Sequence, residues 1–386
     1  MSRPATHAGT WYSDDASKLN HQLHGFFTNA TATLTQINSA NHDDNHHDLN
    51  LDDDDYSHGI KGARILIGPH AGFSYSGSRL AETYQAWDIS RPIKTIFILG
   101  PSHHVAFKNY VMISKYHQYQ TPLGNLHLDV KINNQLINHD FIKFMLNDID
   151  DDEHSFEIHA PFIKYRLNSY QFDSPKIVPI LILSMDSNLL NKLQSCLLPY
   201  LLDPTNHFVV SSDFCHWGSR FAYTKYYAND NLISLSLSTK LKFDDLPIYK
   251  SIEKLDRKAM IIATNGDFDA WIDYINQTGN TICGQKPISL ILKLLQELSK
   301  INSNNNSNGT TNGTTNGTAN GTLNGNSNGT AFGGANGSAG TSINSTNYDL
   351  LSDKPPVFNW IGYSQSNHAK KVYDSSVSYA SGYAIA

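Results

Sequence analysis

The chain has 386 residues, 40% of them hydrophobic and 11% aromatic, which is enough to build a large buried core. Its formal net charge of −6 argues against nucleic acid as the main partner, because phosphate binding needs a concentrated lysine and arginine surface. The sequence shows no apolar signal segment, no apolar run long enough to cross a bilayer and no even set of cysteines. We therefore expect a reduced intracellular protein, cytoplasmic or also nuclear, without membrane insertion.

The first half of the chain predicts alternating helices and strands. Ser13 is a suitable N-cap for a helix that contains two acidic residues in its first turn. We expect this first helix to begin at residue 13, and we expect three more helices at residues 78–87, 130–146 and 159–171. We expect strands at residues 63–68, 94–100, 110–114 and 125–130, the last two joined by a turn at 121–124.

The second half continues the same alternation. Residues 176–184 and 207–213 are nearly continuous apolar runs, as expected for interior strands covered on both faces. Helices are predicted at residues 187–200, 224–240, 249–264 and from Pro287 to 300, and strands at 357–366 and 377–386. The alternation predicts an α/β fold: a layered single domain with a mixed central β-sheet flanked by helices.

Two segments contain almost nothing to bury. Residues 41–59 are rich in acid and histidine, and residues 302–346 repeat the triplet Asn-Gly-Thr. We expect both to be disordered surface insertions within one domain that spans residues 1–386. The histidines of the first insertion could bind metal weakly, but a solvated loop is the favoured interpretation.

Histidine or aspartate follows three of the predicted strands. His70 comes after the strand at 63–68, His103 and His104 after 94–100, and Asp213 and His216 after 207–213. One such residue alone is more often structural, but ligands of open α/β sheets bind at the carboxyl ends of strands. The repeated pattern therefore predicts a shared pocket at this edge of the sheet.

Cys283 lies just before the helix predicted from Pro287. The positive end of a helix dipole lowers the pKa of a nearby thiol, and two imidazoles with a thiolate would suit zinc, copper or iron. The alternative, a small buried hydrophobic cysteine, is equally consistent with the residues alone.

Two further motifs carry weaker signals. In the segment DDEHSFEIHAPF, His154 and Glu157 share a helix face and could support a metal site, or form an ordinary solvated helix start. In the segment HAGTWY, His7 lies in a glycine turn near the start of the chain and could approach the pocket.

Seven motifs in order make the chain resemble the Memo family of cell-motility mediators. They are HAGTWY, PHAGFSYSG, FILGPSHH, DEHSFEIHAPF, SSDFCHWGSRF, NTICG and DSSVSYASGYA, which cover essentially the whole chain outside the two insertions. The resemblance implies a fold similar to the LigB-like class III extradiol dioxygenases, which use non-haem iron. It also implies a pocket built from His70, His103, Asp213, His216 and Cys283, with His104 as a supporting neighbour.

The resemblance implies copper or iron binding, redox activity, and a role in signalling to cell motility and the cytoskeleton through signalling or cytoskeletal partners. On the first hypothesis His70, His103 and Cys283 hold the metal, His216 acts as acid or base and Asp213 orients it. A cysteine in place of the usual carboxylate favours softer metals and argues against ordinary ring cleavage. The alternatives are a catalytically silent adaptor that binds signalling proteins or phosphopeptides, and a dioxygenase-like oxidoreductase.

Overall fold

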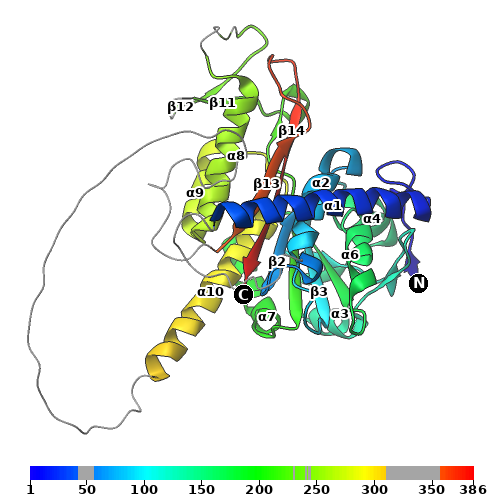
Figure 1. Cartoon of the computed structure of the whole chain (residues 1–386). Coiled ribbons are helices and arrows are strands. Elements are labelled where there is room, and N and C mark those ends of the chain that lie inside the picture. The colour runs from blue at the N-terminus through cyan, green and yellow to red at the C-terminus, as the bar shows by residue number, and fades with distance from the viewer. Residues whose placement is uncertain (42–55, 229–230, 240, 242–244, 310–356) are drawn as a thin grey trace, which may run out of the picture.

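A mixed sheet of nine strands runs through the described part of the chain, which comprises residues 1–41, 56–228, 231–239, 241, 245–309 and 357–386 of the computed structural model (Figure 1). The strands of this sheet are β2 (Ala63–Gly68), β3 (Thr95–Pro101), β4 (Val111–Ile113), β7 (Ile142–Phe144), β8 (Lys176–Ile182), β9 (Asn206–Ser211), β10 (His216–Trp217), β13 (Asn359–Gln365) and β14 (Ser376–Ile385). Their order is β10-β14-β2-β9-β3-β8-β4-β7, and β13 also pairs with β14.

The centre of the sheet is parallel, and both sides of it contain antiparallel pairs. Strand β9 lies between β2 and β3, and β8 follows β3, all four in parallel. Strand β14 runs antiparallel to β2, and β4 runs antiparallel to β8. This arrangement confirms the predicted mixed sheet, and it brings the carboxyl ends of β2, β9 and β3 side by side.

Helices cover both faces of the sheet (Figure 1). They are α1 (Ala16–Asn41), α2 (Phe73–Ala86), α3 (Val130–Leu136), α4 (Asn147–Asp152), α5 (His154–Glu157), α6 (Ala160–Arg166), α7 (Ser187–Leu202), α8 (Ile248–Thr264), α9 (Phe268–Thr278) and α10 (Gln285–Gly309). Short 3₁₀ turns are η1 (Tyr56–His58), η2 (Leu167–Ser169) and η3 (Ser219–Phe221). Smaller sheets are formed by β1 (Ser2–Arg3), β5 (Gln118–Tyr119) and β6 (Leu126–His127), and by β11 (Lys225–Ala228) with β12 (Asn231–Ser234).

The core forms one layer on each face of the sheet, because successive strand residues point to opposite sides. Ile65 and Ile67 pack in the layer that includes α7, α9 and α10. Leu66, between them, packs in the layer that includes α1, α2 and α6. Burial of both faces is why the central strands read as continuous apolar runs in the sequence.

The prediction of a helix at residues 224–240 is wrong, because the chain forms the hairpin β11–β12 there. Tyr226 of β11 is buried against α8, and the nearby Thr224 and Tyr227 are β-branched and aromatic, which favours strands. The helix expected over 130–146 is also wrong beyond Leu136, where β7 pairs with β4 instead.

Several helix ends differ from the prediction. Helix α1 begins at Ala16, and its cap is Asp15, whose carboxylate accepts a hydrogen bond from the Lys18 backbone N–H at 2.9 Å. Helix α2 begins at Phe73, earlier than expected, and α9 was not expected at all. Helix α10 begins two residues before Pro287 and runs to Gly309, into the start of the segment predicted as an insertion.

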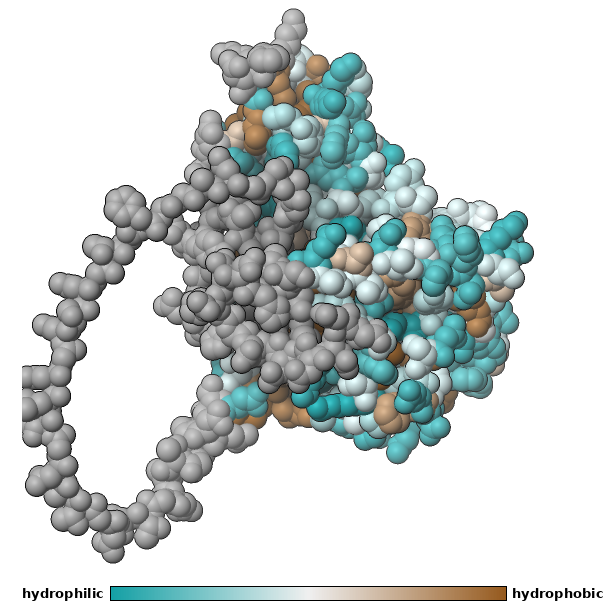
Figure 2. Space-filling model, in the orientation of Figure 1, coloured by the Kyte–Doolittle hydropathy of each residue, from teal (hydrophilic) through white to brown (hydrophobic). Residues whose placement is uncertain are grey.

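The remaining parts of the two predicted insertions, residues 42–55 and 310–346, lie outside the described residues. Among the described helices, none combines the length and hydrophobicity that a membrane span requires. In the coloured part of Figure 2, hydrophobic residues lie among a larger number of hydrophilic ones.

Candidate metal centre

The predicted strand-end residues meet at the carboxyl edge of the sheet. His70 follows β2, His103 follows β3 and Asp213 follows β9, and these three strands are direct neighbours. Together with His216 they line a pocket of about 600 Å³. The other wall of this pocket is formed by residues of the N-terminal segment, α2, η3 and the β13–β14 hairpin: Trp11, Tyr75, Arg220, Phe221, Ser366 and Tyr379. The strand-end pattern therefore located a real cavity.

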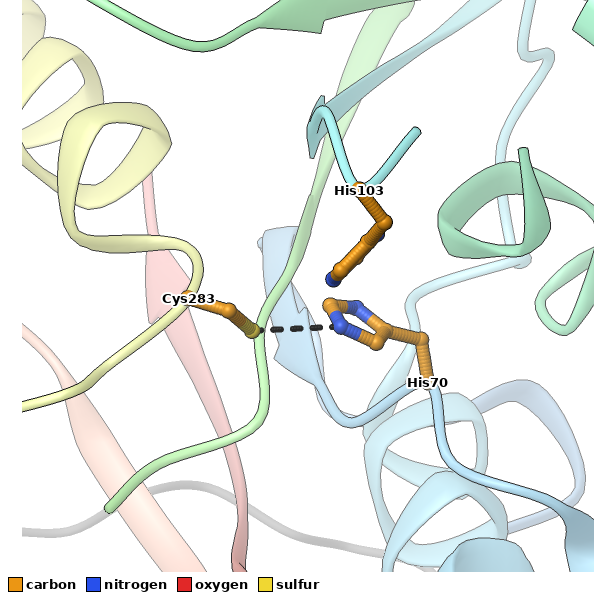
Figure 3. A group of neighbouring side chains, drawn as sticks. All are labelled: His70, His103 and Cys283. Carbon is orange, nitrogen blue, oxygen red and sulfur yellow. Dashed lines mark hydrogen bonds between the residues drawn. The ribbon is translucent and has the colours of Figure 1, made fainter. Parts of the chain in front are cut away.

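His70, His103 and Cys283 point toward one another (Figure 3). One ligand atom from each lies within 4.8 Å of the other two, and the Cys283 Sγ is 3.1 Å from His70 Nε2. The two imidazole centroids are 4.9 Å apart. These are the three residues that the sequence proposed as metal ligands.

A chain of hydrogen bonds fixes the tautomer of His70. The Ser211 hydroxyl donates to the Ser155 carbonyl at 2.7 Å, so its oxygen is left to accept from His70 Nδ1, also at 2.7 Å. The proton of the neutral ring is then on Nδ1, and the Nε2 lone pair faces Cys283. Sequence reasoning missed Ser211, although it is the last residue of the β9 run.

Glu153 fixes His103 in the same way. Its carboxylate accepts from the His103 Nδ1 at 2.8 Å and from two backbone N–H groups, those of His103 and Ser155, at 2.9 Å each. Burial alone would raise the pKa of Glu153, but these donors and the neighbouring His154 lower it to about 2. The ionised carboxylate holds the Nδ1 proton, so the Nε2 of His103 is free to bind a ligand.

The Cys283 thiol and the His70 imidazole form a neutral pair. Burial and the nearby Asp213 charge raise the pKa of Cys283 well above its ordinary value, and burial and neighbouring histidines lower the pKa of His70. The expected lowering of the thiol pKa by the α10 dipole is therefore wrong, because desolvation of the thiol is the larger effect. A thiolate–imidazolium nucleophile is disfavoured here, whereas a cation could replace the thiol proton between Sγ and Nε2.

Asp213 and His216 both line the pocket, but Asp213 is not the hydrogen-bond partner of the His216 Nδ1. Asp213 accepts from the His70 backbone N–H at 2.8 Å, and burial raises the pKa of its carboxyl. The His216 Nδ1 is bonded to the carbonyls of Phe214 and Thr281, at 2.9 and 3.1 Å. These carbonyls, rather than Asp213, orient the His216 ring, and they leave its Nε2 available.

The N-terminal segment is held against the pocket by Glu157. This buried carboxylate accepts from the His7 backbone N–H at 2.8 Å, from the His7 Nδ1 at 2.9 Å and from Tyr12 and Arg3. The adjacent Trp11 lines the pocket, and its ring centroid lies 4.6 Å from that of His154 with the two planes tilted by 42°. His7 and Glu157 therefore shape the wall of the pocket.

His104 stands apart from the ligand group. It is exposed and does not line the pocket, and its ring centroid is 6.5 Å from that of His103. His103, Glu153 and His154 form a second group with ligand spacing. Because the Glu153 oxygens already accept three hydrogen bonds, this group is better explained as outer support for His103 than as a separate metal site.

Comparison with known proteins identifies the family of this chain. The fold and site define an α/β protein with a His/His/Cys group at the carboxyl edge of its sheet. A family model described as Memo-like protein matches residues 3–318. The chain belongs to the Memo family.

The similarity to individual relatives extends over most of the chain. MEMO1 family protein MHO1 of Saccharomyces cerevisiae is 35% identical over 405 residues, covering 99% of this chain and 98% of the yeast protein. Protein MEMO1 of Homo sapiens and that of Xenopus laevis are each 35% identical over 302 residues, covering 78% of this chain and 87% of the relative. The predicted family is therefore confirmed.

Proposed function

We propose that this protein binds a redox metal, copper or iron, through His70, His103 and Cys283. The observation that supports the proposal is the convergence of two imidazole Nε2 lone pairs and one thiol, with both Nδ1 protons engaged by Ser211 and Glu153. Donors held by fixed hydrogen bonds favour metal binding, because the two imidazoles need no change of tautomer.

The donor set suits copper and iron better than a hard cation. Thiolate and imidazole are ligands of soft and borderline metals, whereas magnesium and calcium prefer oxygen. When bound, such a metal would supply one-electron redox chemistry beside a thiol that can itself be oxidised. The Nε2 of His216 is the group placed to accept or donate a proton within the same cavity.

At the cellular level we propose a role in signalling to cell motility and the cytoskeleton, through signalling or cytoskeletal partners. Support for this role comes from membership of the Memo family alone. Dioxygenase-like ring cleavage is a weaker proposal, because the three converging residues include a thiol where those enzymes present a carboxylate.

A second candidate function is that of a catalytically silent adaptor that binds phosphopeptides. The observation that favours it is Arg220, which lines the pocket with its guanidinium carbon 4.4 Å from the Phe221 ring centroid, in a cavity that Tyr75 and Trp11 also line. A guanidinium next to aromatic rings can bind a phosphorylated aromatic side chain. Arg220→Ala should abolish phosphotyrosine-peptide binding on this hypothesis and leave metal affinity unchanged.

The metal proposal is tested on protein purified without oxygen and loaded with Cu(I) or Fe(II). Affinity is measured by competition with a chromophoric chelator for the wild type, His70→Ala and Cys283→Ala, with His104→Ala as the matched control. We expect both pocket variants to lose binding by at least 10-fold and the control to bind like the wild type. Equal affinity in all four proteins would exclude this site.

A further inference from the structure

A fully buried carboxylate, Asp256 of α8, lies behind the pocket and outside its lining. Its Oδ1 accepts from the Cys215 backbone N–H at 3.2 Å and from the Asn280 side-chain amide at 3.0 Å. Its Oδ2 accepts from the Tyr363 hydroxyl at 2.8 Å, and the Ser378 hydroxyl is a further partner. A carboxylate without access to water is retained only where donors of this number surround it.

Two of these donors belong to the two loops that carry the pocket residues. Cys215 immediately precedes His216 and is two residues after Asp213, and Asn280 is three residues before Cys283. The same carboxylate oxygen thus joins the loop after β9 to the loop before α10. The Asn280 amide also donates to the Tyr274 hydroxyl at 2.9 Å, which fixes its orientation toward Asp256.

On the pocket side, the same two loops are joined directly. The Thr281 hydroxyl accepts from the His216 backbone N–H at 2.9 Å and donates to the His216 carbonyl at 2.8 Å. The Cys283 Sγ accepts from the Asp213 backbone N–H at 3.2 Å. Asp256 holds the opposite, buried side, so the spacing of the loops is fixed at both edges.

We propose that Asp256 is a positioning residue that sets the place of Cys283 relative to His70 and His216 by pinning both loops to α8. The expected effect of Asp256 on metal binding rests on the proposed metal function. Its effect on the position of the loops rests on the hydrogen bonds described above. A residue in this role touches neither the metal nor a substrate, and it acts through the backbone of the two loops.

Three variants separate positioning from simple stabilisation. Asp256→Ala removes the pin, whereas Asp256→Asn keeps one oxygen for Cys215 and Asn280 and can turn its amide toward the two hydroxyls. Glu82→Ala is the matched control, because Glu82 is also a buried carboxylate on a helix, and its partners Arg79 and Ser381 lie outside the metal-ligand group. Where Asp256→Ala does not fold, Asn280→Ala breaks the link to one loop and leaves the carboxylate in place.

Two measurements are made on each folded variant. The first is Cu(I) affinity by chelator competition, and the second is the alkylation rate of Cys283 in metal-free protein, followed by peptide mass spectrometry. We expect Asp256→Ala, or Asn280→Ala in its place, to lower the affinity about 10-fold or more and to change the alkylation rate several-fold. Asp256→Asn should restore most of both values, and Glu82→Ala should change the unfolding temperature alone.

The alkylation rate keeps this proposal separate from the metal proposal. If the wild type binds neither Cu(I) nor Fe(II), the metal function fails, yet an altered Cys283 rate in Asp256→Ala still supports the positioning role. The opposite result is that Asp256→Ala, or Asn280→Ala in its place, keeps the wild-type copper affinity and the wild-type alkylation rate while its unfolding temperature falls as in Glu82→Ala. In that case Asp256 only stabilises the fold, and the proposal is overturned.

Discussion

Replacing Glu157 by glutamine should destabilise the protein in a pH-dependent way. The carboxylate accepts hydrogen bonds from Arg3, Thr6, His7 and Tyr12, at distances from 2.6 to 3.1 Å. Burial alone would raise the pKa of Glu157, but His7 and Arg3 lower it from 4.5 to about 2. A glutamine offers one oxygen acceptor instead of two and leaves the buried Arg3 charge without this partner.

The size of the effect follows from that pKa. A decrease of about 2.5 in pKa corresponds to ~3 kcal/mol of stability at neutral pH. Because the pKa in the folded state is the lower one, this contribution is complete above the unfolded value of 4.5 and is lost as the pH falls toward about 2. The difference between wild type and Glu157→Gln should therefore be ~3 kcal/mol at pH ~7 and less than half of that at pH ~3.

Urea unfolding of both proteins at the two pH values measures this difference. Glu253→Gln is the control: Glu253 also has two cationic partners, Lys250 and Arg257, but it is a partly exposed residue of α8. We expect its loss to stay below ~1 kcal/mol. A loss below ~1 kcal/mol for Glu157→Gln at neutral pH, or one that does not change with pH, would refute the reasoning.

Three further predictions concern the pocket and the insertions. Glu153→Gln should lower Cu(I) affinity about 10- to 100-fold, because the amide nitrogen of the glutamine would face one of the three N–H donors that surround Glu153. Unchanged affinity in a chelator competition would contradict this prediction. Iodoacetamide should label Cys283 before the fully buried Cys215 in native metal-free protein, and mass spectrometry would detect the reverse order. Replacing residues 310–346 by a short Gly-Ser linker should change the free energy of unfolding by less than about 1 kcal/mol, and a larger change in urea unfolding would show that the segment stabilises the fold.

The parts of the fold set by local hydrophobic pattern were predictable. The strands β2, β3, β8 and β9 are buried on both faces, so their sequences stand out as apolar runs, and the rule for strand ends then located the pocket. Helix α9 was missed, although Asp267 and Gly279 are recognisable cap residues; the glycine has φ 58°.

The supporting hydrogen bonds of the site could not be predicted from spacing. Glu153 and His103 are separated by 50 residues, and Ser211 and His70 by 141, so only the tertiary fold brings them together. The thiol pKa was mispredicted for a related reason: the helix position of Cys283 is a local feature, but its desolvation depends on the whole pocket. The metal, the partners and the cellular location stay predictions.

The position of β14 has a consequence for how the protein is made. This strand, residues Ser376–Ile385, pairs with β2, β10 and β13, and the Arg64 side chain beside it bonds to the Ala386 carbonyl across 322 residues. During synthesis, β2 leaves the ribosome long before its partner exists. The edge of β2 that faces β14 stays unpaired until residues 376–385 have emerged, so this edge is open to aggregation while the intervening residues are synthesised, and chaperones that shield strand edges should matter for the yield.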